Sequence, residues 1–426
     1  MEAEMRKCFV CRKAESSLSK PMMMCSCKGV YYCGKECQVH DFPSHKEKCT
    51  AHWHKHKEKS KKAGGAECWK VGLDSLKLGK LYLGRDMLDE SEAEIKQAIS
   101  IFVQHKGEEN DMHARALTVL GNLYSNRSQT KNALLSLGKA LEISRLVDED
   151  EQIAGILRDL GTAMGKAGLH ERALEKFQEA HDIFACVYGE RHEEIAKVLH
   201  NMGLVLDELD KSEEAIAKYE LSMEIKKEVL GEDSFSTSTT LLNIGALKTR
   251  MGRLTEAYAS FEEGLAMARR LFAEHSVEGR FLTGMGDARL KDERYREAHE
   301  CYEGALRVFR RTLGAKHPEV ARVLASIAQV HLKQDNHPQA LARLQESYTI
   351  RREGQGPRHV DTAQALCNIA LVKDKLGDRA GSVQALKDAL IIYDLNGGGP
   401  MGPCNSESIR AMLWGLGQAD GVRYLD

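Results

Sequence analysis

The sequence has 426 residues, of which 42% are hydrophobic, 29% charged and 6% aromatic, and it contains only 7 prolines. This composition favours helix in a chain long enough for two or three domains or for one elongated array. The net charge of −2 combines +7 over residues 1–66 with −9 over the remainder. No apolar run reaches the roughly 18 residues that span a bilayer, and the charged N-terminus has no signal-peptide core, so we expect a protein of the cytoplasm or the nucleus.

Seven cysteines and one histidine crowd into the first fifty residues. They are spaced as Cys-x2-Cys, Cys-x-Cys, Cys-x3-Cys and His-x3-Cys, at Cys8, Cys11, Cys25, Cys27, Cys33, Cys37, His45 and Cys49. Thiolates this close can reach one ion from a single turn, and eight ligands suffice for two tetrahedral zinc sites. A segment of this size buries too little apolar surface to fold without metal. Disulfides and an iron–sulfur cluster are the alternatives, and the absence of a secretory signal and the presence of a histidine argue against them.

The residues between these ligands, Val30–Gln38 and Asp41–Lys46, resemble those of a MYND-type zinc finger, and the resemblance covers residues 8–49. It implies two interleaved structural zinc sites: Cys8, Cys11, Cys33 and Cys37 hold one ion, and Cys25, Cys27, His45 and Cys49 hold the other. The Cys25-x-Cys27 pair is one residue shorter than in the family, which leaves the occupancy of that half-site open. MYND fingers bind short proline-containing peptides, so the resemblance implies peptide contacts by Tyr32, Gln38 and Phe42. Packing within the small finger core is the alternative role for Tyr32 and Phe42.

Residues 51–69 form a basic linker rich in lysine and histidine. Such a run could attract phosphate or serve as a nuclear localisation signal. One short run without interleaved aromatic residues does not make a nucleic-acid site, so we expect solvated side chains and no nucleic-acid partner.

A repeat of about 42 residues follows the linker. Its landmark is an apolar residue followed by a small one, and the small residues are Gly79, Gly121, Gly161, Gly203, Gly245, Gly286, Ala328 and Ala370. Sixteen residues after each stands a large residue: Ile95, Leu137, Phe177, Tyr219, Phe261, Tyr302, Leu344 and Leu386. Small residues let two helices approach closely while the large residue fills the space beside them. Each unit is therefore predicted to be an antiparallel helix pair.

The pattern resembles the tetratricopeptide repeat, in the 42-residue variant of kinesin light chains and nephrocystin-3-like proteins. Further support for this variant comes from segments such as Gly189–His192 and Gly314–Pro318. We expect a superhelix over residues 70–396, with eight units starting near residues 72, 114, 154, 196, 238, 279, 321 and 363. Residues 397–426 begin with a Gly/Pro break, after which Ser408–Gln418 is predicted to be a capping helix. The fold class is thus mainly α, an α-solenoid behind a small zinc finger.

Four asparagines lie next to the landmarks on the predicted first helices: Asn122, Asn201, Asn243 and Asn368. In similar arrays, asparagines at these positions reach the backbone of an extended peptide, and an amide side chain offers both donors and acceptors for it. Plain surface exposure or local turn capping is the alternative reading.

These features together predict a zinc-binding scaffold with protein or peptide partners and no enzymatic activity. The alternative is a MYND-containing lysine methyltransferase-like enzyme. The sequence between the finger and the repeats leaves no space for its β-rich catalytic domain, and no nucleophile–base set stands out. The sequence does not identify the partners, the process or the oligomeric state.

Overall fold

The computed structural model describes residues 23–24, 31–32, 54, 57, 68–85, 87–147, 149–231, 234–271, 275–396 and 405–416. These residues contain a two-stranded ladder and helices α2 to α18. The chain divides into two compact units, Met1–Ser234 and Phe235–Asp426.

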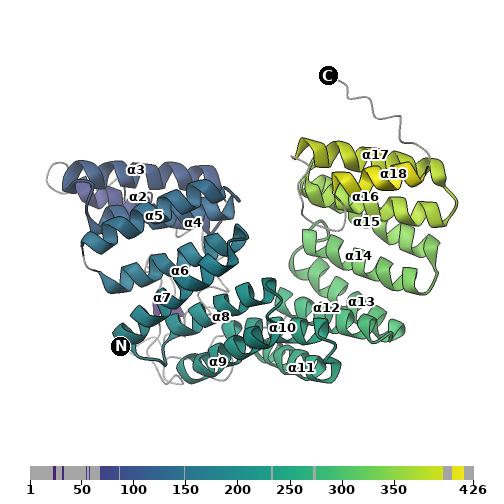
Figure 1. Cartoon of the computed structure of the whole chain (residues 1–426), viewed down its shortest axis with the longest axis horizontal. Helices are drawn as coiled ribbons and strands as arrows, with labels where there is room; N and C mark the ends of the chain where they lie inside the picture. Colours follow the sequence, from purple (N-terminus) through teal and green to yellow (C-terminus); the bar gives the residue numbers. More distant parts are fainter. Residues whose placement is uncertain are drawn as a thin grey trace, which may run out of the picture. The chain divides into compact units, whose positions relative to one another are not determined.

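The first unit contains the ladder and four helix pairs (Figure 1). Strands β1 (Met23–Met24) and β2 (Tyr31–Tyr32) are antiparallel, with Met23 opposite Tyr32 and Met24 opposite Tyr31. The helix pairs are α2 (Cys68–Leu83) with α3 (Leu88–Lys106), α4 (Asp111–Asn126) with α5 (Thr130–Leu146), α6 (Asp150–Lys166) with α7 (His170–Tyr188), and α8 (Glu193–Glu208) with α9 (Ser212–Leu230). Each pair packs on the next, and the first helices α2, α4, α6 and α8 also contact one another in that order.

The second unit contains four more pairs and one extra helix. The pairs are α10 (Phe235–Arg250) with α11 (Leu254–Leu271), α12 (Ser276–Lys291) with α13 (Tyr295–Thr312), α14 (Pro318–Lys333) with α15 (His337–Gly354), and α16 (Val360–Lys375) with α17 (Arg379–Leu395). The predicted α-solenoid of eight helix pairs is therefore confirmed.

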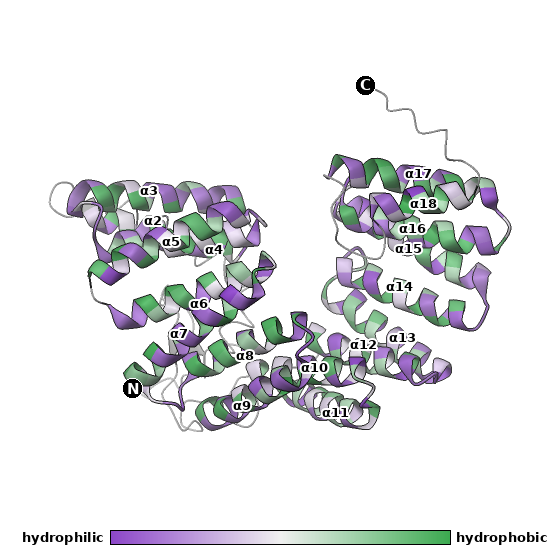
Figure 2. Ribbon diagram, viewed as in Figure 1, coloured by the Kyte–Doolittle hydropathy of each residue, from purple (hydrophilic) through white to green (hydrophobic). Residues whose placement is uncertain are grey.

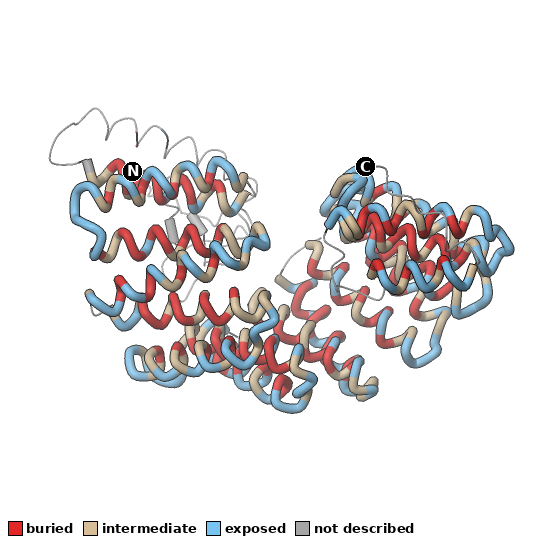
Figure 3. The backbone as a smooth tube through the Cα atoms, turned by 45° about the horizontal axis from the view of Figure 1, so that its top comes forward, coloured by how far each residue is buried: buried red, intermediate tan, exposed pale blue. Residues whose placement is uncertain are grey.

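The landmark residues position the helices of each pair as predicted. A Cβ atom built on Gly161 would lie 2.7 Å from the ring of Phe177, and one on Gly203 would lie 2.7 Å from the ring of Tyr219. Both rings are almost fully buried. Apolar and polar residues alternate along the ribbons (Figure 2), and the buried residues form stripes along the helices (Figure 3). This is the pattern expected when each helix turns one face toward its neighbours.

Two kinds of local signal mark where the helices end and begin. The turn between the two helices of a pair contains a residue with positive φ, which is a glycine in three pairs, such as Gly168 with φ 74°, and a polar residue in four others, such as Asp210 with φ 57°. Histidines precede four first helices and accept a hydrogen bond from the backbone N–H two residues later. These histidines are His192, His275, His317 and His359. The imidazole nitrogen thereby satisfies one of the unpaired N–H groups at a helix start.

Helix α18 (Ser406–Gly415) covers the last helix pair, as the prediction of a capping helix requires. It begins two residues before the predicted start and packs on α17 through the buried side chains of Ile409 and Leu413. The Asn405 side chain accepts a hydrogen bond from the Ser408 N–H at 2.7 Å and fixes the helix start. The array needs this cover because α17 would otherwise expose one apolar side.

Candidate functional site

Two of the predicted groove asparagines flank helix α6 in the first unit. The Nδ2 atom of Asn122 on α4 donates a hydrogen bond to Oδ2 of Asp159 at 2.7 Å. The Nδ2 atom of Asn201 on α8 donates to Oγ1 of Thr162 at 3.2 Å. Both asparagines are half-buried. Three successive first helices are thus joined by amide side chains on one surface.

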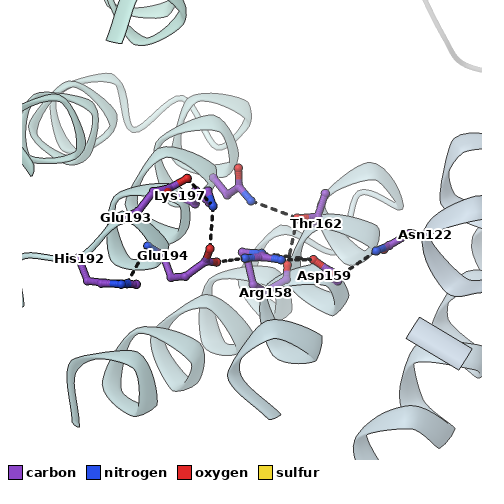
Figure 4. A network of polar contacts seen from close by, with 9 residues as sticks. Asn122, Arg158, Asp159, Thr162, His192, Glu193, Glu194 and Lys197 are labelled. Carbon is purple, nitrogen blue, oxygen red and sulfur yellow. Dashed lines mark hydrogen bonds and ion pairs between the residues drawn. The ribbon is translucent and has the colours of Figure 1, made fainter. Parts of the chain in front are cut away.

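Arg158 extends this network along the same surface (Figure 4). Its Nε and Nη2 atoms donate to Oδ1 of Asp159 at 3.2 and 3.0 Å, while Nη1 pairs with Glu194 on α8. Lys197 pairs with Glu194 at 2.7 Å and with Glu193 at 2.8 Å. Burial lowers the pKa of Lys197, but the two glutamates outweigh it and hold the pKa above its usual value. The ammonium therefore stays charged within the network.

A groove of about 360 Å³ lies beside Asn122, between helices α2, α4 and α6. Cationic side chains of Lys80, Arg115 and Arg158 line it together with Asp159. The pKa of Lys80 is lowered, mainly by burial and to a lesser extent by the positive charge of Arg115. The groove therefore presents amide, ammonium, guanidinium and carboxylate groups, which can hydrogen-bond both the backbone and the side chains of a peptide.

The other two asparagines lie in the second unit. Asn368 on α16 accepts a hydrogen bond from Gln364 Nε2 at 3.3 Å, and Asn243 on α10 is half-buried. Between them in sequence, the first helices α12 and α14 carry two arginines at matched positions, Arg280 and Arg322. Arg322 pairs with Glu319 at 2.5 Å.

The predicted zinc ligands lie outside the described residues, as do Gln38 and Phe42 of the predicted finger peptide site. These ligands are Cys8, Cys11, Cys25, Cys27, Cys33, Cys37, His45 and Cys49. Tyr32 is described only through its backbone, as the last residue of β2. Within the described part of the chain, no cluster of three or more His, Cys, Asp or Glu residues could hold a metal ion.

Arg158, Asp159, Glu194 and Lys197 were not singled out from the sequence. The signal that identifies the asparagines would have found only Asp159 among these four residues, since Asp159 occupies the same position relative to its landmark as Asn201. Their pairing could not be inferred in this way, because it depends on which rotamers reach across neighbouring helices.

Comparison with known families identifies both parts of the chain. The tetratricopeptide repeat family matches residues 152–228, 208–270, 236–303, 278–353 and 327–394, which together exceed half of the chain. The MYND finger family matches residues 8–49. The chain belongs to the tetratricopeptide repeat family and carries a MYND finger at its N-terminal end. No curated protein sequence matches it.

The solved structures of NprR and RapI support the same fold. The apo form of the quorum sensor NprR from B. thuringiensis is 13% identical with a TM-score of 0.57, covering 83% of this chain and 97% of its own. The apo form of RapI is 18% identical with a TM-score of 0.52, and the match covers 67% of this chain and 98% of RapI. A Podosopora anserina putative kinesin light chain with TPR-like repeats is 17% identical with a TM-score of 0.43, covering 48% and 98%. At these identities the likeness concerns the fold alone.

Tetratricopeptide repeats and MYND fingers are interaction modules and are typically non-catalytic, so the chain is in general terms a protein-interaction adaptor. The MYND family is a zinc-binding one, which supports zinc as the cofactor. Among the described residues, no helix is both long enough and apolar enough to cross a membrane.

Proposed function

We propose that this protein is a scaffold that holds two protein ligands on one chain. Its repeat array binds an extended peptide segment of one partner, and its zinc finger binds a short proline-containing peptide of another. Two sites on one chain raise the effective concentration of one ligand near the other. The observation that carries the array site is the pair of amides, Asn122 and Asn201, on either side of α6.

These amides keep bonding capacity for a ligand. Each uses one N–H for its contact with α6, and within the described residues neither Oδ1 atom accepts a hydrogen bond. A peptide backbone offers an N–H and a C=O at every residue, so the remaining amide oxygen and N–H can each find a partner. The contacts with Asp159 and Thr162 fix the orientation of both amides before a ligand arrives, which lowers the entropic cost of binding.

Asn243 and Asn368 are proposed to play the same part in the second unit. The Gln364 contact orients the Asn368 amide through its oxygen, whereas Asp159 orients Asn122 through an N–H. Each of the two units would then have its own peptide-binding surface.

The finger site rests on the spacing of the cysteines and the histidine in the sequence. Cys8, Cys11, Cys33 and Cys37 are proposed to hold one structural zinc ion, and Cys25, Cys27, His45 and Cys49 a second. In the antiparallel ladder Met24 lies opposite Tyr31, and Met23 lies opposite Tyr32. Tyr32, Gln38 and Phe42 are the proposed peptide contacts.

The array site is tested by selecting ligands from an immobilised library of 12-residue peptides with the full-length chain. Peptides that it retains should bind at least tenfold more weakly to the double variant Asn122→Ala/Asn201→Ala, while its melting temperature stays unchanged. Asn132→Ala is the matched control, because Asn132 is exposed on the second helix α5. Unchanged affinity in the double variant, or an equal loss in the control, would rule out this groove.

A further inference from the structure

Ion pairs of one geometry join successive second helices in both units. In the first unit, Arg145 on α5 pairs with Glu179 on α7 at 2.5 Å. In the second unit, Arg310 on α13 pairs with Glu346 on α15 at 2.6 Å. In both, the arginine stands 24 residues after the landmark of its repeat and the glutamate stands 18 residues after the next landmark. The two pairs therefore occupy one repeated structural position.

Between α11 and α13 the corresponding pair of positions holds the arginine but not the glutamate. Arg269 stands 24 residues after Gly245, but the residue 18 after Gly286 is Gly304. Arg269 turns instead to Glu278 on α12, to which its Nε and Nη2 atoms lie at 2.8 Å. The carboxylate found at this position in the two ion pairs is therefore absent between α11 and α13.

A hollow of about 400 Å³ remains where that carboxylate would stand. A Cβ atom built on Gly304 would lie 3.4 Å from Leu282 Cδ1 and 3.8 Å from Arg307 Nη2, both ordinary contacts. The position therefore has space for a side chain. We call this hollow, lined by Arg269, Gly304, Arg307 and Arg311, the arginine hollow.

The arginine hollow carries more positive than negative side chains. Arg307 and Arg311 follow Gly304 on one face of α13 and are exposed. Within the described residues Arg307 makes no hydrogen bond or ion pair. Two glutamates also line the hollow, but Glu278 is paired with Arg269, and Glu300 lies 3.4 Å from Arg296. Guanidinium groups thus exceed carboxylates, and one of them retains all its donors for an external group.

We propose that the arginine hollow binds a carboxylate side chain from an acidic segment of a partner protein. The incoming carboxylate takes the place of the missing glutamate and accepts hydrogen bonds from Arg307. A planar guanidinium binds a carboxylate through two parallel N–H bonds, which suits this role. The hollow exceeds the volume of one carboxylate, so a segment with several acidic residues fits better than a single one. This site is separate from the asparagine groove.

The test uses a fluorescein-labelled decaglutamate peptide and full-length protein, with fluorescence anisotropy read at low ionic strength. Decaglutamate should bind with an affinity that falls as salt rises, and decaglutamine should not bind. Arg307→Ala should weaken binding at least fivefold. Gly304→Glu should weaken it more, because the built-in carboxylate occupies the hollow.

Three controls keep this result specific. Gly304→Ala should bind within twofold of the unaltered chain, because a methyl group leaves the hollow open. Arg358→Ala removes an exposed arginine elsewhere in the second unit and should have no effect. Asn122→Ala/Asn201→Ala should also bind decaglutamate normally, which separates this site from the groove.

The proposal is overturned if decaglutamate does not bind, if Gly304→Glu and Arg307→Ala leave its affinity unchanged, or if Arg358→Ala weakens it equally. A DNA oligonucleotide that binds more tightly than decaglutamate and depends on Arg307 would instead assign the hollow to nucleic acid. That outcome also overturns the proposal.

Discussion

The buried Lys57 and the half-buried Glu94 form an ion pair between the basic segment and the first helix pair. The Nζ atom of Lys57 lies 2.8 and 2.6 Å from the two carboxylate oxygens of Glu94, and it donates a third hydrogen bond to Gln97 Oε1 at 2.8 Å. A ring nitrogen of His54 forms a hydrogen bond with the hydroxyl of Tyr82 on α2. The expectation of solvated side chains throughout residues 51–69 is therefore wrong at Lys57, which is 5% exposed.

Removing this lysine should destabilise the start of the array. Lys57→Ala leaves the Glu94 carboxylate without its cation, and loss of one partner of a buried pair costs about 2–3 kcal/mol where some water contact remains. The expected result is faster amide hydrogen exchange in α2 and α3. The matched control is Lys96→Ala. Lys96 lies on α3, as Glu94 does, and its side chain is 59% exposed and pairs with Glu92 at 2.7 Å. Equal exchange in the two variants would contradict a special role for Lys57.

The close approach at the landmarks predicts opposite effects for one substitution at two helical glycines. At Gly161 a Cβ atom would lie 2.7 Å from the buried ring of Phe177, so Gly161→Ala should lower the free energy of unfolding by about 1–3 kcal/mol through overpacking. At Gly138 on α5 a Cβ atom meets nothing within 4 Å. Gly138→Ala should therefore raise the free energy of unfolding by up to about 1 kcal/mol through helix propensity alone. Urea denaturation measures both, and a stabilising Gly161→Ala would contradict the packing argument.

His200 should make the first unit sensitive to acid. Burial, and then the nearby charge of Lys226, lowers the pKa of this imidazole from 6.5 to about 3. The ring of Tyr219 packs against it with ring centroids 5.3 Å apart. As the pH falls below 6.5 the unfolded chain binds a proton that the folded chain does not, so stability is lost progressively toward pH 3. The slope from this one group is at most about 1.4 kcal/mol per pH unit.

Two variants check this linkage. His200→Gln removes the titrating group and should reduce the slope of unfolding free energy against pH between 6.5 and 4. Lys226→Met removes the second cause of the shift and should raise the pKa of His200, which an NMR titration of the ring protons measures. A slope unchanged in His200→Gln would show that other groups dominate the acid sensitivity.

The helix pairs could be predicted from the sequence because their cause is steric and local. Glycine at position 161 and phenylalanine at 177 are required by one close contact, and the same kind of contact recurs in the other repeats whose landmark is a glycine. Periodic apolar residues then determine which face of each helix is buried. Repetition makes such a signal visible in a single sequence.

Features that depend on side-chain reach were not predictable in the same way. In the sequence, the segment that includes His192 indicates only a family resemblance, whereas in the structure the His192 ring caps α8 by accepting a hydrogen bond from the Glu194 N–H. Asp210 occupies a positive-φ turn position that glycine fills in other repeats, such as Gly168. The arginine hollow becomes apparent only when Gly304 is compared with Glu346 in space, because a glycine alone carries no sign of a missing charge.

Metal removal should separate the finger from the array. Zinc analysis of the full chain should give two ions per molecule, and Cys33→Ser should lose the ion proposed for Cys8, Cys11, Cys33 and Cys37. Folding of a small metal domain depends on its ion, whereas the repeats bury their own apolar cores, so chelation should leave their helical circular dichroism and melting temperature unchanged. Cys186→Ser is the matched control, because Cys186 is an exposed free cysteine on α7, and it should retain both ions. One ion per unaltered chain would contradict the two-site assignment and would point first to the short Cys25-x-Cys27 pair as the half-site that does not bind. Zinc loss in the Cys186→Ser control would contradict the assignment of the ligands to the finger.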